Sequence, residues 1–338
     1  MASGKILRKL IKAGVSGDSE AFRRVSATVI DDERQKQHHL LANDLEQILY
    51  GEDLSRSAMP RSFVPDIPLD KERGLPLLEL RQTQRSLCEI VLPSSSQLAL
   101  EELIEEHRRS DVLASFGLKA SGKVMFYGPP GCGKTLAAEV IAFELDRPLA
   151  IVRLDTLVSS FLGETAANLR KVFDFIAGYP MVALFDEFDA IGKERGDSGE
   201  HGELRRVVNA LLQMMDAYQG QSLLLAATNH EQILDSAIWR RFDDTIQIPV
   251  PGAQEVHRLL QMKLRGVRRE FEHDEEELLA IFENKTGADI ERVVRRAIKR
   301  MILRRKEFLS VGDLQSAMAR ENERFSRAAT GLKTKQKR

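Results

Sequence analysis

Short apolar runs alternate with longer stretches of helical spacing between residues 121 and 250. In chain order the runs are "VMFYG", "LAIVRL", "MVALFD", "SLLLAATN" and "TIQIPV". Runs that are apolar at nearly every position are typical of strands buried on both faces. Strands of this kind that alternate with helices indicate a parallel sheet with right-handed crossovers and helices on both sides. The pattern therefore predicts an α/β domain.

Two other parts of the chain show helical periodicity. Residues 1–57 read as short helices, because apolar residues recur at helical spacing: Phe22, Val25 and Val29, then Leu41, Leu45, Ile48 and Leu49. From residue 253 onward the chain reads as helices only. There, "GADIERVVRRAIKRMILRRK" places apolar residues on a single stripe: Ile290, Val293, Val294, Ala297, Ile298 and Ile302.

A proline-rich stretch without periodicity separates the N-terminal helices from the α/β pattern. The stretch "SAMPRSFVPDIPLDKERGLP" has four prolines and no period, which marks a linker. After it, "SLCEIVLP" is expected to form a strand and "QLALEELIEEHRR" a helix. The expected parts are an N-terminal helical interaction module at 1–57, a linker at 58–76, an α/β core at 77–251, a helical domain at 252–325 and a basic disordered tail at 326–338.

Composition narrows the class of protein. A formal charge of -1 and 30% charged residues fit a soluble protein with no overall bias toward nucleic acid. No apolar run approaches the roughly 18 residues of a membrane-spanning helix, so no membrane partner is expected. Only Cys88 and Cys132 are present, without metal-ligand spacing, which favours a reducing cytoplasm.

The strongest motif for chemistry is "GPPGCGKT", which matches the phosphate-loop pattern G-x-x-x-x-G-K-[ST] in full. It follows the expected strand "VMFY" and precedes the helical "LAAEVIAFEL", as such a loop must. Its glycines let backbone N–H groups surround phosphate oxygens without Cβ clashes, and the helix N-terminus adds partial positive charge. Lys134 is expected to reach the β- and γ-phosphates and the Thr135 hydroxyl to coordinate Mg²⁺. The residues expected to bind the nucleotide here are Gly128, Pro129, Pro130, Gly131, Cys132, Gly133, Lys134, Thr135 and Leu136.

One residue of this loop raises a separate expectation. Cys132 stands next to the helix N-terminus and near Lys134, and both features stabilise a thiolate. Its thiol is therefore expected to have increased reactivity, and alkylation there to block nucleotide binding.

Polar side chains at the ends of two other strands complete a candidate hydrolytic site. Asp186 ends "MVALFD" and is expected to hold Mg²⁺ directly or through water. Glu187 is expected to orient and polarise the attacking water, because a carboxylate can accept a proton as the phosphorus–oxygen bond forms. Asn229 ends "LLLAATN" and is expected to hydrogen-bond the same water or the γ-phosphate.

Paired arginines occur in "LDSAIWRRFDD", just before the fifth apolar run. Arg240 and Arg241 fit two interpretations, a charged surface patch or a group that stabilises charge on the transferred phosphoryl group. The pattern alone does not separate them.

Together these motifs resemble those of the AAA family of ATPases, from about residue 111 to residue 323. "GPPGCGKT" looks like the family's Walker A motif, "ALFDEFDAI" its Walker B motif, and "AATN" the segment that carries sensor 1. "LDSAIWRRFDDTIQIPVP" is similar to the second region of homology in katanin, spastin and the ESCRT-disassembling ATPase. "MMDAY" resembles the intersubunit signalling segment, and "TGADIERVVRRA" resembles the lid motif whose Gly-Ala pair, here Gly287 and Ala288, lies against adenine. The family's usual Asp-Ile-Gly-Gly stretch is missing around "EIVLPSSSQ".

The resemblance implies a fold, cofactors and an assembly. The fold is a five-stranded parallel core followed by an all-helical lid, and the cofactors are ATP and Mg²⁺. The subunits are expected to form a ring, usually a hexamer, in which Arg240 and Arg241 act on the neighbouring subunit's site. That arrangement makes hydrolysis depend on a neighbour.

The resemblance also gives a role to "FLG", a place where two large apolar side chains stand in an expected loop. Phe161, Leu162 and Gly163 match the aromatic–hydrophobic–Gly triplet of pore loop 1, which lines the central channel. An aromatic side chain there can grip an extended polypeptide without reading its sequence. The alternative is a purely structural role, in which Phe161 packs into the core.

These expectations favour an ATP-hydrolysing motor that remodels, unfolds or threads protein clients. The N-terminal module would choose the client or a separately encoded partner. Two other functions are a nucleic-acid-associated loader ATPase, supported by the Arg-rich helix of the lid, and a regulatory switch that scaffolds a partner such as a protease. The aromatic pore loop argues against the first, and Glu187, Asn229 and the paired arginines argue against the second.

Overall fold

The computed structural model describes residues 25, 26, 28, 66–70, 74–154, 162–191, 201–234, 236–272 and 276–335. The chain divides into two compact units, Met1–Asp66 and Ile67–Arg338. In the first unit Val25, Ser26 and Thr28 are helical. The rest of the predicted N-terminal module lies outside the described residues.

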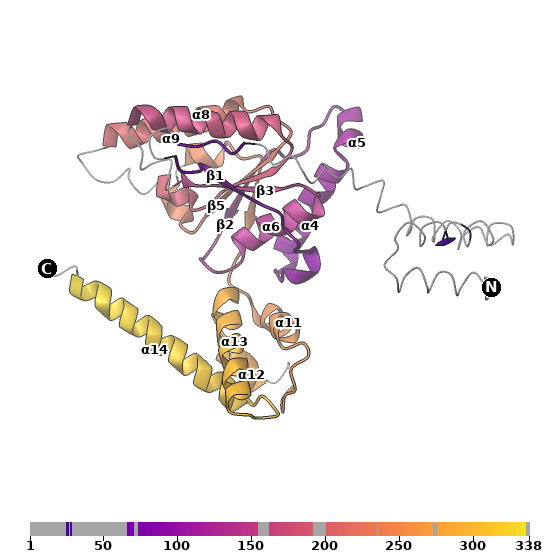
Figure 1. The fold of residues 1–338 in the computed structure, drawn as a ribbon, viewed down its shortest axis with the longest axis vertical. Coiled ribbons are helices and arrows are strands. Elements are labelled where there is room, and N and C mark those ends of the chain that lie inside the picture. Colours follow the sequence, from indigo (N-terminus) through magenta and orange to yellow (C-terminus); the bar gives the residue numbers. More distant parts are fainter. Residues whose placement is uncertain are drawn as a thin grey trace. The chain divides into compact units, whose positions relative to one another are not determined.

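The described residues of the second unit contain a six-stranded sheet, in the order β1-β3-β4-β5-β2-β6. Figure 1 labels β1, β2, β3 and β5 of this sheet. The five predicted parallel strands are confirmed as β2 to β6, and neighbours among them pair in parallel. The sequence did not predict β1, which pairs antiparallel with β3 at the edge of the sheet. The strands are β1 Leu78–Arg81, β2 Lys123–Tyr127, β3 Leu149–Val152, β4 Val182–Phe185, β5 Leu223–Thr228 and β6 Asp244–Gln247.

The strand expected at "SLCEIVLP" is wrong. The segment instead contains a short 3₁₀ helix, η1, at Leu87–Glu89, whose start is capped by Ser86 and Glu89. Beyond it, neighbouring apolar residues pack into different cores: Ile90 and Leu92 join a core under the sheet, and Val91 packs against the C-terminal helices. Consecutive apolar residues here serve two cores, so they do not form one strand.

Helices cover both faces of the sheet (Figure 1). Alternate residues along each strand face opposite sides, so Met125 joins one core and Val124 and Phe126 join the other. The first core packs against α8 and α9, the second against α4 and α6. The helical elements of this part are α4 Ser94–Arg108, α5 Ser110–Ser115, α6 Lys134–Glu144, α8 Leu162–Gly178, η2 Phe188–Ile191, α9 His201–Ala217, η4 Glu231–Ile233 and α10 Ser236–Trp239.

The C-terminal helices share a third core of their own. They are α11 Ala253–Lys263, α12 Glu276–Ile281, α13 Gly287–Leu303 and α14 Val311–Lys335. The predicted stripe on α13 is buried from Ile290 to Ala297, and Ile298 packs against the same core. Ile302 is an exception, because 62% of its surface is exposed. It lies in the last turn of α13, beyond the reach of the core.

Part of the predicted linker makes specific contacts with α8. Asn168 Nδ2 donates to Asp70 Oδ2 at 3.1 Å, and Lys171 Nζ donates to the Leu69 carbonyl at 3.0 Å. Asp70 and Asn168 are both buried. A buried polar pair of this kind holds its two segments together, because separating them would leave a polar group without a partner.

Over the described part of the chain, no helix combines the length and apolar character needed to cross a bilayer.

Candidate functional site

The predicted phosphate loop connects β2 to the start of α6. Its three glycines all have positive φ, at 140° for Gly128, 78° for Gly131 and 113° for Gly133. At Gly128 a Cβ atom would lie 2.2 Å from the carbonyl oxygen of Ile248, the residue after β6. Both the backbone conformation and this close approach therefore require glycine.

Lys134 extends over its own loop. Its Nζ donates to the carbonyls of Gly128 at 2.7 Å and Pro129 at 2.8 Å. Burial lowers the pKa of Lys134, although the carboxylates of Asp186 and Asp189 act in the opposite direction. The ammonium group is thus held where phosphate oxygens would enter the loop.

Thr135 and Asp186 meet across the gap between α6 and β4. The Thr135 hydroxyl donates to Asp186 Oδ2 at 2.8 Å. A hydroxyl and a carboxylate are hard oxygen ligands, which Mg²⁺ prefers together with water and phosphate. The adjacency of these two oxygens fits the Mg²⁺ site predicted from the sequence.

Glu187 adopts an unusual backbone conformation directly after β4. Its φ is 52°, in the left-handed region that non-glycine residues seldom occupy. Its backbone N–H donates to Asp186 Oδ1 at 2.8 Å, and its side chain is exposed beside the cavity. Left-handed residues cost energy and concentrate at functional sites, so this geometry adds an independent reason to place Glu187 in the site.

Asn229 is held at the end of β5 by a residue that the sequence analysis missed. Asp189 is buried in η2, and its Oδ1 accepts bonds from the Asn229 backbone N–H at 3.2 Å and the Thr228 hydroxyl at 3.4 Å. Asp189 therefore ties the segment after β4 to the end of β5. A carboxylate within the otherwise apolar "FDAI" was the available sequence signal.

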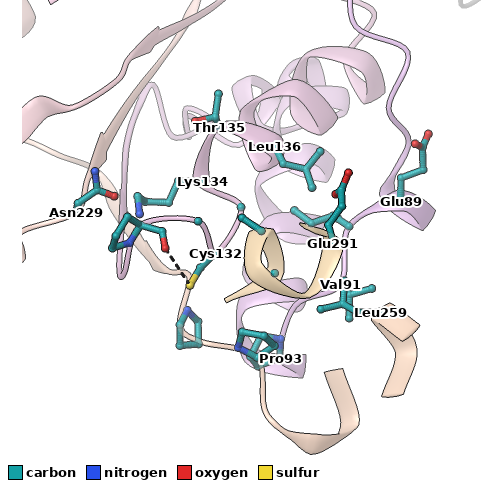
Figure 2. A pocket seen from close by; sticks show the side chains of 18 of the residues that line it. Glu89, Val91, Pro93, Cys132, Lys134, Thr135, Leu136, Asn229, Leu259 and Glu291 are labelled. Atoms are coloured by element: carbon teal, nitrogen blue, oxygen red, sulfur yellow. Dashed lines mark hydrogen bonds between the residues drawn. The ribbon is translucent and has the colours of Figure 1, made fainter. Parts of the chain in front are cut away.

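A cavity of about 400 Å³ joins these residues to the C-terminal helices. Lys134 and Asn229 lie toward one end, and Val91 and Leu259 toward the other (Figure 2). Of the predicted nucleotide-binding and catalytic residues, the structure places the following in its lining: Pro130, Gly131, Cys132, Gly133, Lys134, Thr135, Leu136, Asp186, Glu187, Asn229, Gly287 and Ala288.

The start of α13 closes the cavity against the phosphate loop. The Ala288 backbone N–H donates to the Gly131 carbonyl at 3.0 Å. A Cβ atom on Gly131 would lie 3.0 Å from Thr286 Oγ1 and 3.2 Å from Ala288 Cβ, so the two segments are in close contact. Gly287 and Ala288 are thus brought to the loop, although more than 150 residues separate them from it.

The segment "EIVLP", which departs from the Asp-Ile-Gly-Gly pattern, also lines the cavity. Glu89, Ile90, Val91 and Pro93 face apolar Leu259 and Met262 of α11, together with an ion pair. In that pair Lys263 Nζ and Glu291 Oε2 are 2.8 Å apart, and the hydrogen bond from Lys263 lowers the pKa of Glu291. The sequence change therefore leaves a largely apolar chamber with a charged rim.

The paired arginines lie outside this cavity. Arg240 is exposed, and Arg241 Nε donates to Asp216 Oδ2 at 2.9 Å while Nη1 donates to the Ala237 carbonyl at 2.6 Å. Phe242, the next residue, is anchored in the core against Phe188 with ring centroids 6.0 Å apart. The structure therefore does not bring Arg240 and Arg241 to the phosphate loop of their own chain.

The neighbours of Cys132 in the sequence suggested a lowered thiol pKa, and this expectation is wrong. Burial raises the pKa of the Cys132 thiol, and the positive charge of Lys134 only partly offsets that effect. The Sγ atom lies 4.0 Å from the Pro130 carbonyl, which is a weak contact (Figure 2). The sequence showed that a cation, Lys134, is close to Cys132. It did not show that the fold removes the Cys132 thiol from water.

The predicted pore loop is only partly described. Leu162 and Gly163 are the first residues of α8, whereas Phe161 lies outside the described residues.

Comparisons with known proteins agree with this architecture. Residues 124–250 match the family described as "ATPase family associated with various cellular activities (AAA)". The chain is 41% identical over 324 residues to "Uncharacterized AAA family ATPase y4kL" of Sinorhizobium fredii (strain NBRC 101917 / NGR234), which covers 96% of this chain and 97% of that protein. It is 39% identical over 183 residues to human "ATPase family gene 2 protein homolog A", which covers 51% of this chain and 20% of that protein. Its fold is similar to the crystal structure of the FIGL-1 AAA domain, with a TM-score of 0.59, 22% identity and coverage of 76% of this chain and 92% of that one.

Proposed function

Because the chain belongs to the AAA family of ATPases, we propose that it is a Mg²⁺-dependent ATP hydrolase that forms a ring, expected to be a hexamer, and remodels, unfolds or threads protein clients. The observation that carries the hydrolytic part is the shared cavity. Glu187 and Asn229 line this cavity together with the phosphate loop, and the start of α13 contacts that loop. Such a site has groups for activating water as well as groups for binding phosphate.

Each step of the chemistry has a residue in this chain. Lys134 and the loop glycines bind the phosphates, and Thr135 and Asp186 would hold Mg²⁺. The metal supplies positive charge that offsets the charge on the transferred phosphoryl group. The Glu187 carboxylate accepts a proton from the attacking water, and the Asn229 amide orients that water. The apolar chamber near Val91 and Leu259 would take the adenine.

The position of the arginines supports a ring. An arginine that stabilises developing charge must reach the phosphoryl group. Arg241 is instead bonded to Asp216, outside the cavity of its own chain. A neighbouring subunit is the natural target for such a group, so hydrolysis would couple to assembly.

The remodelling part of the proposal rests on "FLG", the triplet that resembles pore loop 1. Phe161 would contact an extended polypeptide in the channel, and α8, which begins at Leu162, would carry its movement. The nucleic-acid alternative loses some support, because three arginines of α13 are paired within the chain. Arg292, Arg295 and Arg296 form ion pairs with Asp289, Glu291 and Glu321, respectively.

Two variants test the proposal. One retains bound ATP and clients, and the other separates client unfolding from ATP hydrolysis. A Glu187→Gln protein should hold ATP and retain clients, which a pull-down with mass spectrometry would identify. Phe161→Ala should then abolish ATP-driven unfolding of that client, with ring assembly and basal hydrolysis preserved within a few-fold. Phe161→Tyr, which keeps the flat apolar ring, should retain much of the activity. A Phe161→Ala protein with a lowered melting temperature and no hydrolysis would mean that Phe161 is a core residue.

A further inference from the structure

Glu321, on α14, is a buried carboxylate that none of the proposed chemistry uses. Only 1% of its surface is exposed. Two arginines of α13 lie over it: Arg296 Nη1 is 2.9 Å from Oε2, and Arg292 Nε is 3.6 Å from Oε1. Burying a carboxylate is costly unless it is paired, so α13 and α14 are held in one relative position wherever these ion pairs persist.

Arg292 connects Glu321 to the cap of α13. Its Nη2 lies 2.5 Å from Asp289 Oδ1. Asp289 Oδ2 in turn accepts from the Thr286 hydroxyl at 2.7 Å, and the Asp289 backbone N–H donates to Thr286 Oγ1 at 3.2 Å. These reciprocal bonds satisfy the start of α13 and fix where the helix begins.

The capped end of α13 is the part that meets the phosphate loop. The bond from the Ala288 N–H to the Gly131 carbonyl and the close approach of Thr286 to Gly131 both lie there. A continuous series of contacts therefore runs from α14 through α13 to the loop. It passes from Glu321 through Arg292 and Asp289 to Thr286, and it ends at Gly131, which Thr286 and Ala288 both approach.

The geometry points to Glu321 as a positioning residue for nucleotide binding, which holds the start of α13 against the phosphate loop through Arg292 and Asp289. This inference rests on the proposed nucleotide site. The C-terminal helix α14 thereby becomes part of that site's support, at a distance from the nucleotide.

If Glu321 only stabilised the fold, its loss would lower the stability and the nucleotide affinity together. A positioning role predicts a different outcome. Docking of α14 on α13 already has an apolar contribution from Leu314, Ala317 and Met318, all of which are buried in the shared core. Loss of the carboxylate charge should therefore leave α14 docked on α13, but the start of α13 should be held less firmly against the phosphate loop. The nucleotide affinity would change more than the stability.

The experiment compares Glu321→Gln with Glu323→Gln, the same substitution at an exposed position of the same helix. The readouts are the dissociation constant of a fluorescent ATP analogue, kcat and KM for ATP, and the melting temperature. Glu321→Gln should weaken binding and raise KM about 10-fold, the scale of residues along a coupled network, with kcat less affected. Glu321→Asp, which keeps the charge, should recover part of the affinity, and Glu323→Gln should bind normally.

A second variant keeps the inference testable if Glu321→Gln does not fold. Arg292→Gln cuts the link between Glu321 and Asp289 and should weaken binding similarly. The loss in Glu321→Gln/Arg292→Gln should be less than the sum of the two single losses, because both act on one pathway. Normal affinity in folded Arg292→Gln and Glu321→Gln proteins would overturn the inference while the nucleotide site stood. Absence of analogue binding by the unaltered protein would overturn both.

Discussion

Arg241 donates a 2.9 Å hydrogen bond from Nε to Oδ2 of Asp216, which lies near the end of α9 in the same chain. This ion pair joins the segment that resembles the second region of homology to the segment that resembles the intersubunit signalling motif. The partner restricts the guanidinium and presents it at the surface, away from its own cavity. In the proposed ring, Arg241 is the residue expected to act on the neighbouring subunit's site.

Arg241→Ala should therefore leave ATP binding near normal and lower hydrolysis about 10³-fold, the lower range for an arginine finger. Arg265→Ala, at an exposed arginine in the turn after α11, is the matched control and should have normal turnover. Mixing Arg241→Ala subunits with Lys134→Ala subunits should restore some activity, because an intact pocket can then meet an intact arginine. Verified mixed rings without recovery would count against action in trans.

Lys134 and Glu187 should separate binding from turnover. Glu187→Gln keeps the shape of the side chain but cannot accept a proton, so turnover should fall by about 10²-fold or more while ATP binding persists. Lys134→Ala removes the ammonium that the loop carbonyls hold, so it should weaken binding itself. Isothermal titration and a phosphate-release assay distinguish the two outcomes. Full turnover in Glu187→Gln would remove that residue from the catalytic role.

The raised pKa of Cys132 makes a prediction about alkylation. A thiol with a raised pKa is less ionised at a given pH, and only the thiolate reacts. Iodoacetamide near neutral pH should therefore modify exposed Cys88 faster than Cys132. The Cys132 rate should continue to climb as the pH rises through the alkaline range, and bound ATP should suppress it. Peptide mass spectrometry over a pH series measures both rates, and preferential labelling of Cys132 at neutral pH would contradict the structure.

The contact between Asp70 and Asn168 should control the attachment of the segment that enters the ATPase unit. Asp70→Ala leaves the buried Asn168 amide without this acceptor, which should cost about 1–3 kcal/mol. Hydrogen exchange around Ile67–Asp70 and in α8 should increase. Asp66→Ala, at an exposed neighbour, is the control and should exchange normally. Unchanged protection in Asp70→Ala would show that the apolar contacts alone hold the segment.

Features that depend on a local pattern were predictable from the sequence. Strands β2 to β5 were predictable because a strand buried on both faces needs a nearly continuous apolar run, whereas the edge strand β6 is exposed at three of its four positions. The phosphate loop was predictable because its glycines, lysine and threonine act within one short segment. The buried stripe of α13 followed from helical periodicity, apart from Ile302, which required knowledge of where the core ends.

Burial and pairing between residues that are distant in the sequence could be seen only in the folded chain. Desolvation of Cys132 reversed an expectation based on its neighbours, and "SLCEIVLP" served two cores instead of one strand. The partners of Arg241 and Glu321 are separated from them by about 25 residues, so no local pattern marks the pairs. Burial and long-range pairing are properties of the folded chain, because the surfaces that create them meet only after α9, α13 and α14 have packed.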